Sequence, residues 1–194
     1  MRWRNTHANW GAVAKTFHWI IALLILGNLA LGYWADGLPR SPDKGYWFHW
    51  HKTIGLTVLW LVALRLLWRL SSLVPPLPPA TPRWQRIAAG TSHFLLYLAM
   101  FAMPISGWVM HSAADRTLDL YGLFTVPDIV AATGERAEAI GDTAGAVHYY
   151  LFITLLVLIA IHVLGALKHA LVDRDGVLTR MLPFSRASDP IRGE

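Results

Sequence analysis

Four apolar segments of roughly 20 residues each constrain the fold of this chain more than any other feature. They cover residues 16–35, 49–70, 90–110 and 146–169. Each segment is long enough to cross a hydrocarbon core about 30 Å thick as an α-helix, which satisfies its own backbone hydrogen bonds in lipid. The sequence therefore predicts an all-α integral membrane protein, a bundle of four transmembrane helices that forms a single domain over residues 1–194.

The composition supports a lipid-embedded chain and excludes several kinds of site. Of the 194 residues, 55% are hydrophobic and only 15% are charged, which is typical of a protein surrounded by lipid. We attribute the formal net charge of +5 to topology and lipid headgroups, and expect no nucleic-acid partner. Cysteine is absent, which rules out disulfides, thiolate-bound iron–sulfur clusters and covalently attached c-type haem.

The distribution of basic residues predicts the orientation, because Lys and Arg are retained on the cytoplasmic side. They lie before the first segment, around the Pro-rich connector 71–82 and after the fourth segment: Arg2, Arg4, Lys15, Arg65, Arg69, Arg83, Arg86, Lys168, Arg174, Arg180, Arg186 and Arg192. Both termini are therefore expected in the cytoplasm, with the first segment retained as a helix. The acidic connector 112–145 should form a small periplasmic subdomain, with a short helix at about 127–141.

Histidines inside the apolar segments point to the chemistry, because polar side chains within a membrane are costly and usually functional. His148 and His162 are fourteen residues apart in the fourth segment, which puts them about 21 Å apart on one face of a helix. His18 lies near the cytoplasmic start of the first segment, at the depth of His162. His51 enters the second segment from the periplasmic side, at the depth of His148.

This match in depth predicts two bis-histidine metal sites, one in each leaflet. The expected ligand pairs are His18 with His162 and His51 with His148. Two neutral imidazoles suit a haem iron that exchanges single electrons, since no coordination position stays open for oxygen. A lone membrane histidine is more often a hydrogen-bond partner between helices, but four histidines matched in depth and face favour metal binding.

Other polar residues and several glycines are assigned weaker roles. Lys52, Arg65, Arg69 and Lys168 are candidates for pairing with haem propionates, and snorkelling towards the headgroups is the alternative. Glycines within or near the segments would let a flat macrocycle or a neighbouring helix approach. These glycines are Gly27, Gly32, Gly55, Gly107 and Gly165.

The remaining histidines are distinguished by position. His49 competes with His51, but two residues rotate a helical side chain by about 200°, so only one of them can face the bundle. His93 has no partner left at its depth, and it is assigned either a quinone or propionate contact or a packing role. His7 and His111 are expected at the surface.

Several segments resemble the bacterial cytochrome b561 family of small four-helix membrane cytochromes with two haems. The resemblance covers nearly the whole chain, and it lies in the order and spacing of motifs that are weak one by one. They are FHW at 17–19, HKTIG at 51–55, LRLLWRL at 64–70, HFLLYLAMFAMPISGWVM at 93–110 and KHALVDRDGVLTRMLP at 168–183. The family implies the same two histidine pairs that depth alone predicts.

The histidines and the resemblance together predict an electron-transfer oxidoreductase with two haems b in the bacterial inner membrane. A small-molecule donor is expected to reduce the periplasmic haem, and ubiquinone in the lipid is expected to accept the electron. His93, His169 and Lys168 are weak candidates for contacting the quinone.

Resemblance to superoxide-oxidising members of the family suggests superoxide as the donor. Arg40, Lys44, Lys52 and Arg116 could attract such an anion to the periplasmic side. The acidic third connector would repel it, which leaves the donor open.

Two other functions remain open on the sequence alone. The chain could be a haem b anchor subunit that relays electrons for a larger dehydrogenase or hydrogenase, through a redox partner protein. It could also be a metal-ion or proton transporter with histidines along its path. A red preparation with a sharp reduced α-band would exclude the transporter.

Overall fold

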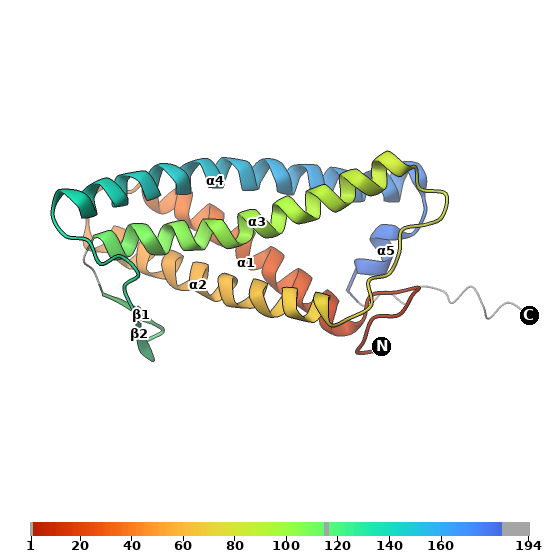
Figure 1. Ribbon diagram of the computed structural model, residues 1–194, viewed down its shortest axis with the longest axis horizontal. Helices are drawn as coiled ribbons and strands as arrows, with labels where there is room; N and C mark the ends of the chain where they lie inside the picture. Colours follow the sequence, from red (N-terminus) through yellow and green to blue (C-terminus); the bar gives the residue numbers. More distant parts are fainter. Residues whose placement is uncertain (1, 115–116, 184–194) are drawn as a thin grey trace, which may run out of the picture.

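Four long helices form an elongated bundle in the computed structural model, which describes residues 2–114 and 117–183 (Figure 1). They are α1 (Ala12–Asp36), α2 (Pro42–Leu70), α3 (Arg83–Ala113) and α4 (Glu135–Lys168). All four are long and apolar enough to cross a membrane. The prediction of an all-α transmembrane bundle is confirmed, and each helix starts several residues before its apolar segment.

The ends of the helices follow from local sequence. Ser41 caps α2 by accepting a hydrogen bond from the Lys44 backbone N–H, while Pro42 and Asp43 occupy the first turn. This is a favourable helix start, because the cap satisfies an otherwise unpaired N–H and the carboxylate faces the positive end of the helix dipole. The helix ends just before the Pro-rich connector, where proline cannot continue it.

The core lies along the bundle axis, where all four helices contribute apolar side chains. Ile21, Val62, Met100 and Leu155, one from each helix, are less than 9% exposed within it. Many large apolar side chains point outwards instead, as expected of a surface that faces lipid rather than water. The bundle thus has an interior for a buried site and an exterior suited to a bilayer.

The connector between α3 and α4 differs from its prediction. It contains an antiparallel hairpin of β1 (Leu118–Leu120) and β2 (Phe124–Val126), which was not predicted. The separate helix expected at 127–141 is wrong: residues 127–133 lie outside helices and strands, and the next helix is α4 itself, beginning at Glu135. Glu135 and Glu138 in its first turn favour that start, because they face the positive end of the helix dipole.

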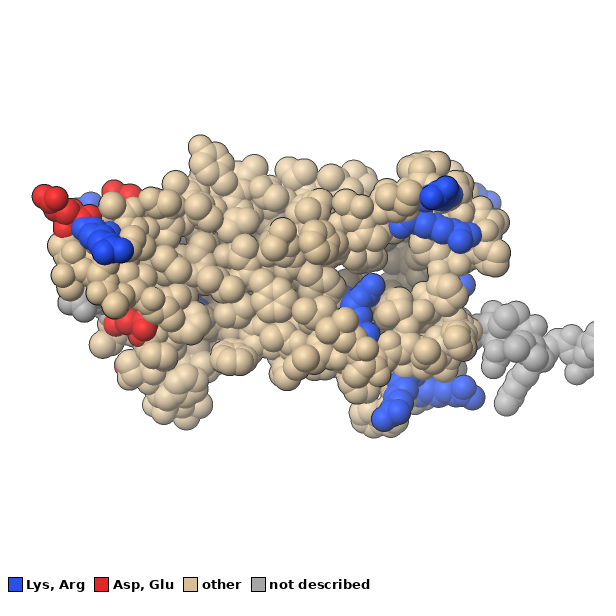
Figure 2. Space-filling model, viewed as in Figure 1, with Lys and Arg blue, Asp and Glu red and all other residues tan. Residues whose placement is uncertain are grey.

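The two ends of the bundle carry different charges. One end, called here the termini end, holds the N-terminal segment, the Pro-rich connector and the short elements after α4, namely the π-helix η1 (His169–Asp173) and α5 (Val177–Met181) (Figure 1). The other, the hairpin end, holds the hairpin and the α1–α2 link. Lys and Arg gather at the termini end and most Asp and Glu at the hairpin end, with an uncharged belt between them (Figure 2).

The termini end is closed by hydrogen bonds between segments that are distant in sequence. The Asn5 side chain donates to the Leu73 carbonyl at 2.7 Å, and Trp19 Nε1 donates to the Met181 carbonyl at 2.9 Å. Arg180 donates to the Pro76 carbonyl at 3.0 Å. These bonds join the N-terminal segment, the Pro-rich connector and α5 into a cover over the ends of the helices.

Candidate functional site

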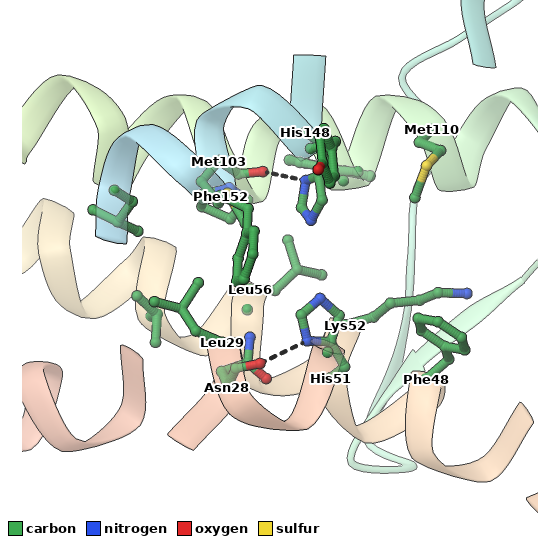
Figure 3. Close-up of a pocket in the computed structure, with 18 of the residues that line it drawn as sticks. Asn28, Leu29, Phe48, His51, Lys52, Leu56, Met103, Met110, His148 and Phe152 are labelled. Atoms are coloured by element: carbon green, nitrogen blue, oxygen red, sulfur yellow. Dashed lines mark hydrogen bonds between the residues drawn. The ribbon is translucent and has the colours of Figure 1, made fainter. Parts of the chain in front are cut away.

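His51 of α2 and His148 of α4 point towards each other across the interior of the hairpin end (Figure 3). Their ring centres are 6.2 Å apart, and their planes are at 84°. His51 Nδ1 donates to the Asn28 backbone carbonyl at 3.1 Å, and His148 Nδ1 donates to the Met103 carbonyl at 3.0 Å. Since a carbonyl can only accept, both rings carry their proton on Nδ1 and keep the Nε2 lone pair for a ligand.

A cavity of about 450 Å³ surrounds this pair. Residues from all four long helices line it, including Asn28, Leu56, Met103 and Phe152 (Figure 3). Its volume lies within the range of about 300–1,000 Å³ that is usual for cofactor and small-molecule sites. The pair therefore faces a space large enough for a group bound between the two rings.

Two glycines lie directly against the rings of this pair. A Cβ on Gly32 would be 2.6 Å from His51 Cε1 and 2.8 Å from its Nδ1. A Cβ on Gly107 would be 3.1 Å from His148 Cε1. A side chain at either position would displace the imidazole, so these two glycines set the positions of the rings.

The other three glycines named from the sequence have no such role in the described part of the chain. A Cβ would come no closer than 3.5 Å to another group at Gly27, Gly55 and Gly165. A side chain at these three positions would therefore not displace a histidine ring.

Ser106 adds a second contact to His148. Its Oγ lies 3.0 Å from His148 Nδ1 and donates to the Met103 carbonyl at 2.7 Å. The hydroxyl thus accepts from the imidazole N–H while its own proton is held by the backbone. Ser106 was not singled out from the sequence, although a small polar residue inside a spanning helix is a recognisable signal for contact between helices.

His18 of α1 and His162 of α4 form the second pair, towards the termini end. Their ring centres are 6.1 Å apart with planes at 71°. His93 of α3 stands beside His162, with ring centres 5.4 Å apart. His93 therefore shares the depth of this pair, whereas the sequence had left it without a partner.

Arg65 is a cation in direct contact with this second pair. Its guanidinium donates to His18 Nδ1 at 3.2 Å and lies 5.7 Å from the centre of the Tyr97 ring. Because arginine can only donate, the neutral His18 ring here carries its proton on Nε2.

The spacing of both pairs suits two imidazoles on opposite sides of one metal. Two metal–nitrogen bonds of about 2 Å, with roughly 1.1 Å from each nitrogen to its ring centre, separate the ring centres by about 6.2 Å. The two pairs lie at 6.2 and 6.1 Å. Imidazole is a ligand that iron accepts readily, so the residues present fit a haem held between each pair.

Buried polar atoms accompany both pairs. Asn28 Oδ1 and Tyr97 Oη are buried and have no hydrogen-bond partner among the residues that the structure describes. Asn28 lines the cavity around His51 and His148, and Tyr97 lies against Arg65. Unpaired buried oxygens are rare because they forfeit their hydration, so both sites fit a ligand that carries polar groups.

The expectation that His111 lies at the surface is wrong. His111 is 6% exposed and lines the cavity, with its Nδ1 3.2 Å from Lys52 Nζ, although it was expected at the surface. The reason is that α3 continues to Ala113, so that His111 still faces the bundle. His7, expected at the surface as well, is exposed.

Arg69, Lys168 and His169 make contacts with residues other than the four paired histidines. Arg69 lies 6.0 Å from the centre of the Trp10 ring, and Lys168 pairs with Asp173 at 2.5 Å. His169 Nδ1 lies 2.6 Å from an oxygen of Asp175.

His49 packs against the Trp50 ring, with ring centres 6.3 Å apart, while His51 faces the cavity. Arg116, Arg186 and Arg192 lie outside the described residues.

Comparisons with known proteins agree with this geometry. A family model described as prokaryotic cytochrome b561 matches residues 9–184. The cytochrome b561 homolog 2 of Escherichia coli (strain K12) is 37% identical over 187 residues, which cover 94% of this chain and 95% of that protein. A probable superoxide oxidase, CybB, of Yersinia pestis is 28% identical over 184 residues, covering 93% and 99%.

The match spans almost the entire described chain, including both histidine pairs and all four helices. The chain therefore belongs to the prokaryotic cytochrome b561 family and is a multi-pass bacterial membrane protein that binds haem b and transfers electrons.

Proposed function

We propose that this protein binds two haems b, one at each histidine pair, and carries electrons across the bacterial inner membrane to a quinone. The observation that carries the proposal is the two facing histidine pairs, with ring centres 6.2 and 6.1 Å apart, which come from α1, α2 and α4 of one chain. His148 and His162 supply one ligand to each site from the same face of α4. By helix rise the two sites are about 21 Å apart.

Haem held by two imidazoles supplies a one-electron couple and no open position for oxygen. The chain supplies placement and tuning. His51 and His148 keep Nε2 free because backbone carbonyls bind their Nδ1 protons. Gly32 and Gly107 clear the space that these rings need.

His18 needs a proton shift before it can bind a metal through Nε2. Its proton must move to Nδ1, which then no longer accepts from Arg65. The released guanidinium is left beside the site, where a haem propionate is the acceptor we assign to it. Arg65 is therefore placed where it would bind the acidic edge of the cofactor.

The orientation follows from charge. Basic residues gather at the termini end and acidic residues at the hairpin end (Figure 2), so the positive-inside rule puts the termini in the cytoplasm. The His51–His148 site then lies in the periplasmic leaflet and the His18–His162 site in the cytoplasmic leaflet.

Superoxide is the donor we propose, and quinone is the acceptor. A relative that is 28% identical is named a probable superoxide oxidase, which supports this choice. Two superoxide ions lose one electron each and leave as two O2 molecules. The two electrons and two protons from the cytoplasm reduce one quinone to quinol.

The quinone is assigned to the cytoplasmic leaflet, next to the His18–His162 site. His93 is already in contact with His162 there. His169, with its Asp175 partner at 2.6 Å, stands two turns further along and can pass protons from the cytoplasm. Lys168 is held by Asp173, so its role would be to balance charge rather than to touch the quinone.

The purified protein in nanodiscs that contain ubiquinone tests this function. Superoxide generated by xanthine oxidase should disappear faster than by spontaneous dismutation, with one quinol formed for every two superoxide ions. Loss of either histidine pair should stop quinol formation. A preparation with both haems that forms no quinol from superoxide would contradict the proposed donor, and copurification of a stoichiometric soluble subunit would favour an anchor role.

Ser106→Ala is expected to raise the midpoint potential of one haem by tens of millivolts. The hydroxyl that accepts from His148 Nδ1 makes the imidazole a stronger electron donor and so favours the ferric state. Redox titration followed at the α-band measures the shift. Ser106→Thr, which keeps the hydroxyl, should preserve the wild-type value, and equal potentials in all three proteins would show that the contact does not tune the haem.

A further inference from the structure

The hairpin β1–β2 is packed against the side of a spanning helix. Leu118, Leu120 and Val126 of the strands form a buried cluster with Leu56 of α2, and Leu59 and Trp108 pack against it. Leu56 lies fourteen residues after the start of α2. One face of the hairpin therefore packs with apolar side chains against the side of α2.

The tip of the hairpin reaches well below the start of the apolar segment of α2. Tyr121 Oη lies 2.8 Å from Thr57 Oγ1, and the Tyr121 ring lies 6.1 Å from the Trp50 ring, centre to centre. Thr57 is ten residues beyond Trp47, a distance of about 15 Å along the helix. Tryptophans such as Trp47 and Trp50 usually mark the level of the headgroups.

The backbone at the tip is strained, and these contacts hold it. Tyr121 has φ 56, a left-handed conformation that is unfavourable for a residue other than glycine. Gly122, with φ 70, adopts the same region freely. Strain of this kind persists where surrounding contacts enforce it, and here the hydrogen bond to Thr57 and the packing on Trp50 do so.

The exposed side chains of the tip are apolar. Leu123 is 79% exposed and Phe124 is 55% exposed. Just beyond Thr57, the residue that Tyr121 of the tip contacts, α2 carries an outward-facing stripe with helical spacing, namely Trp60, Leu64 and Leu67, at 63%, 50% and 63% exposure. That stripe faces lipid because α2 spans the membrane.

The strands also have a polar side. In the hairpin register Asp119 pairs with Thr125, and their side chains are joined by a hydrogen bond of 2.8 Å on the face away from Leu118 and Leu120. A two-stranded sheet with open edges is unstable in the hydrocarbon core because its edge groups lack partners. At the boundary between headgroups and acyl chains, the polar face can contact headgroups and water while the apolar side chains contact acyl chains.

We propose that residues 121–124 of the hairpin are immersed in the periplasmic leaflet, at the boundary between headgroups and acyl chains. The partner of this surface is phospholipid. Leu118 of the hairpin also lines the cavity around His51 and His148, so the hairpin lies next to that site. The inference rests on membrane insertion of the bundle and not on which donor or quinone the protein uses.

Site-directed spin labelling tests this placement, and the absence of cysteine makes each introduced thiol unique. Leu123→Cys and Phe124→Cys carry a nitroxide in protein reconstituted into nanodiscs of phosphatidylethanolamine and phosphatidylglycerol. Power saturation compares collisions with oxygen, which concentrates in lipid, and with a water-soluble nickel chelate. Asp128→Cys is the aqueous control and Leu156→Cys, on the outer face of α4, is the mid-membrane control.

Both tip labels should favour oxygen over the nickel chelate, with a ratio between those of the two controls. The nanodisc leaves both faces of the bilayer accessible to the nickel chelate. A ratio equal to that at Asp128 would overturn the proposal and indicate a water-exposed surface free for a protein partner. Both haems should remain bound in either case, so loss of electron transfer would not be confused with this result.

Discussion

The His148→Ala variant is expected to bind one haem per chain instead of two. In the proposed assignment His148 is one of two imidazole ligands at the hairpin end, where its ring centre lies 6.2 Å from that of His51. A single remaining imidazole binds haem more weakly than two, so this haem should be lost in detergent. The other proposed site has His18 and His162 as its ligands, with ring centres 6.1 Å apart. It lies about 21 Å away on α4 and should stay intact.

Haem content after pyridine extraction, divided by protein concentration, measures this change. His49→Ala is the matched control, since His49 lies on the same helix as His51 but packs against Trp50, and this variant should keep both haems. Electron transfer from superoxide to quinone should fall to background in His148→Ala alone. Two haems in His148→Ala would refute the assignment of this residue.

The Gly32→Ala variant is expected to weaken haem binding at the same site roughly tenfold or more. The added Cβ would be 2.6 Å from His51 Cε1, so the ring must move away from the position that faces His148. Overpacking of this kind costs on the order of 1–3 kcal/mol. The movement also threatens the bond from His51 Nδ1 to the Asn28 carbonyl.

Gly27→Ala, on the same helix, separates this effect from helix propensity. A Cβ there meets nothing within 4 Å in the described chain, and both substitutions gain the same intrinsic helical preference. Titration of haem into the apoprotein should give wild-type stoichiometry and affinity for Gly27→Ala and a weakened site for Gly32→Ala. Equal affinities in the two variants would mean that Gly32 does not position His51.

Helix length and depth were predictable from the sequence because the bilayer imposes both. An apolar segment must be about 20 residues long to span it, and basic residues mark its cytoplasmic ends. Helix rise then assigns a depth to each histidine, so the sequence alone matches His18 with His162 and His51 with His148. The structure brings the members of each pair to about 6 Å between ring centres.

Features that depend on the backbone or on side-by-side packing were not predictable. The acceptors of the His51 and His148 protons are main-chain carbonyls of Asn28 and Met103, which every residue type offers. Five glycines fitted the same expectation, but only the packing of the helices shows that Gly32 and Gly107 touch imidazoles.

The hairpin and the buried position of His111 were also not predictable, because both depend on where short or extended elements begin and end. The strands are three residues long, too short for a pattern to stand out. The helix before them runs past its apolar segment, which carries His111 inside the bundle. Polar sequence after an apolar segment indicates the membrane boundary but not where the helix ends.

Of the two other functions that the sequence left open, membership of a haem b-binding family argues against the transporter. The histidines of this protein are arranged in matched pairs rather than in a continuous path. Leu155 and other core residues are buried between the two pairs. An anchor role in a larger complex uses the same two sites and differs only in the partner that accepts the electron.

The ratio of haem b to protein in the wild-type chain tests the central claim most directly. We predict two haems per chain, with a reduced α-band that titrates in two one-electron steps. A ratio of one in fully loaded protein, or a colourless preparation, would contradict the assignment of one haem to each histidine pair.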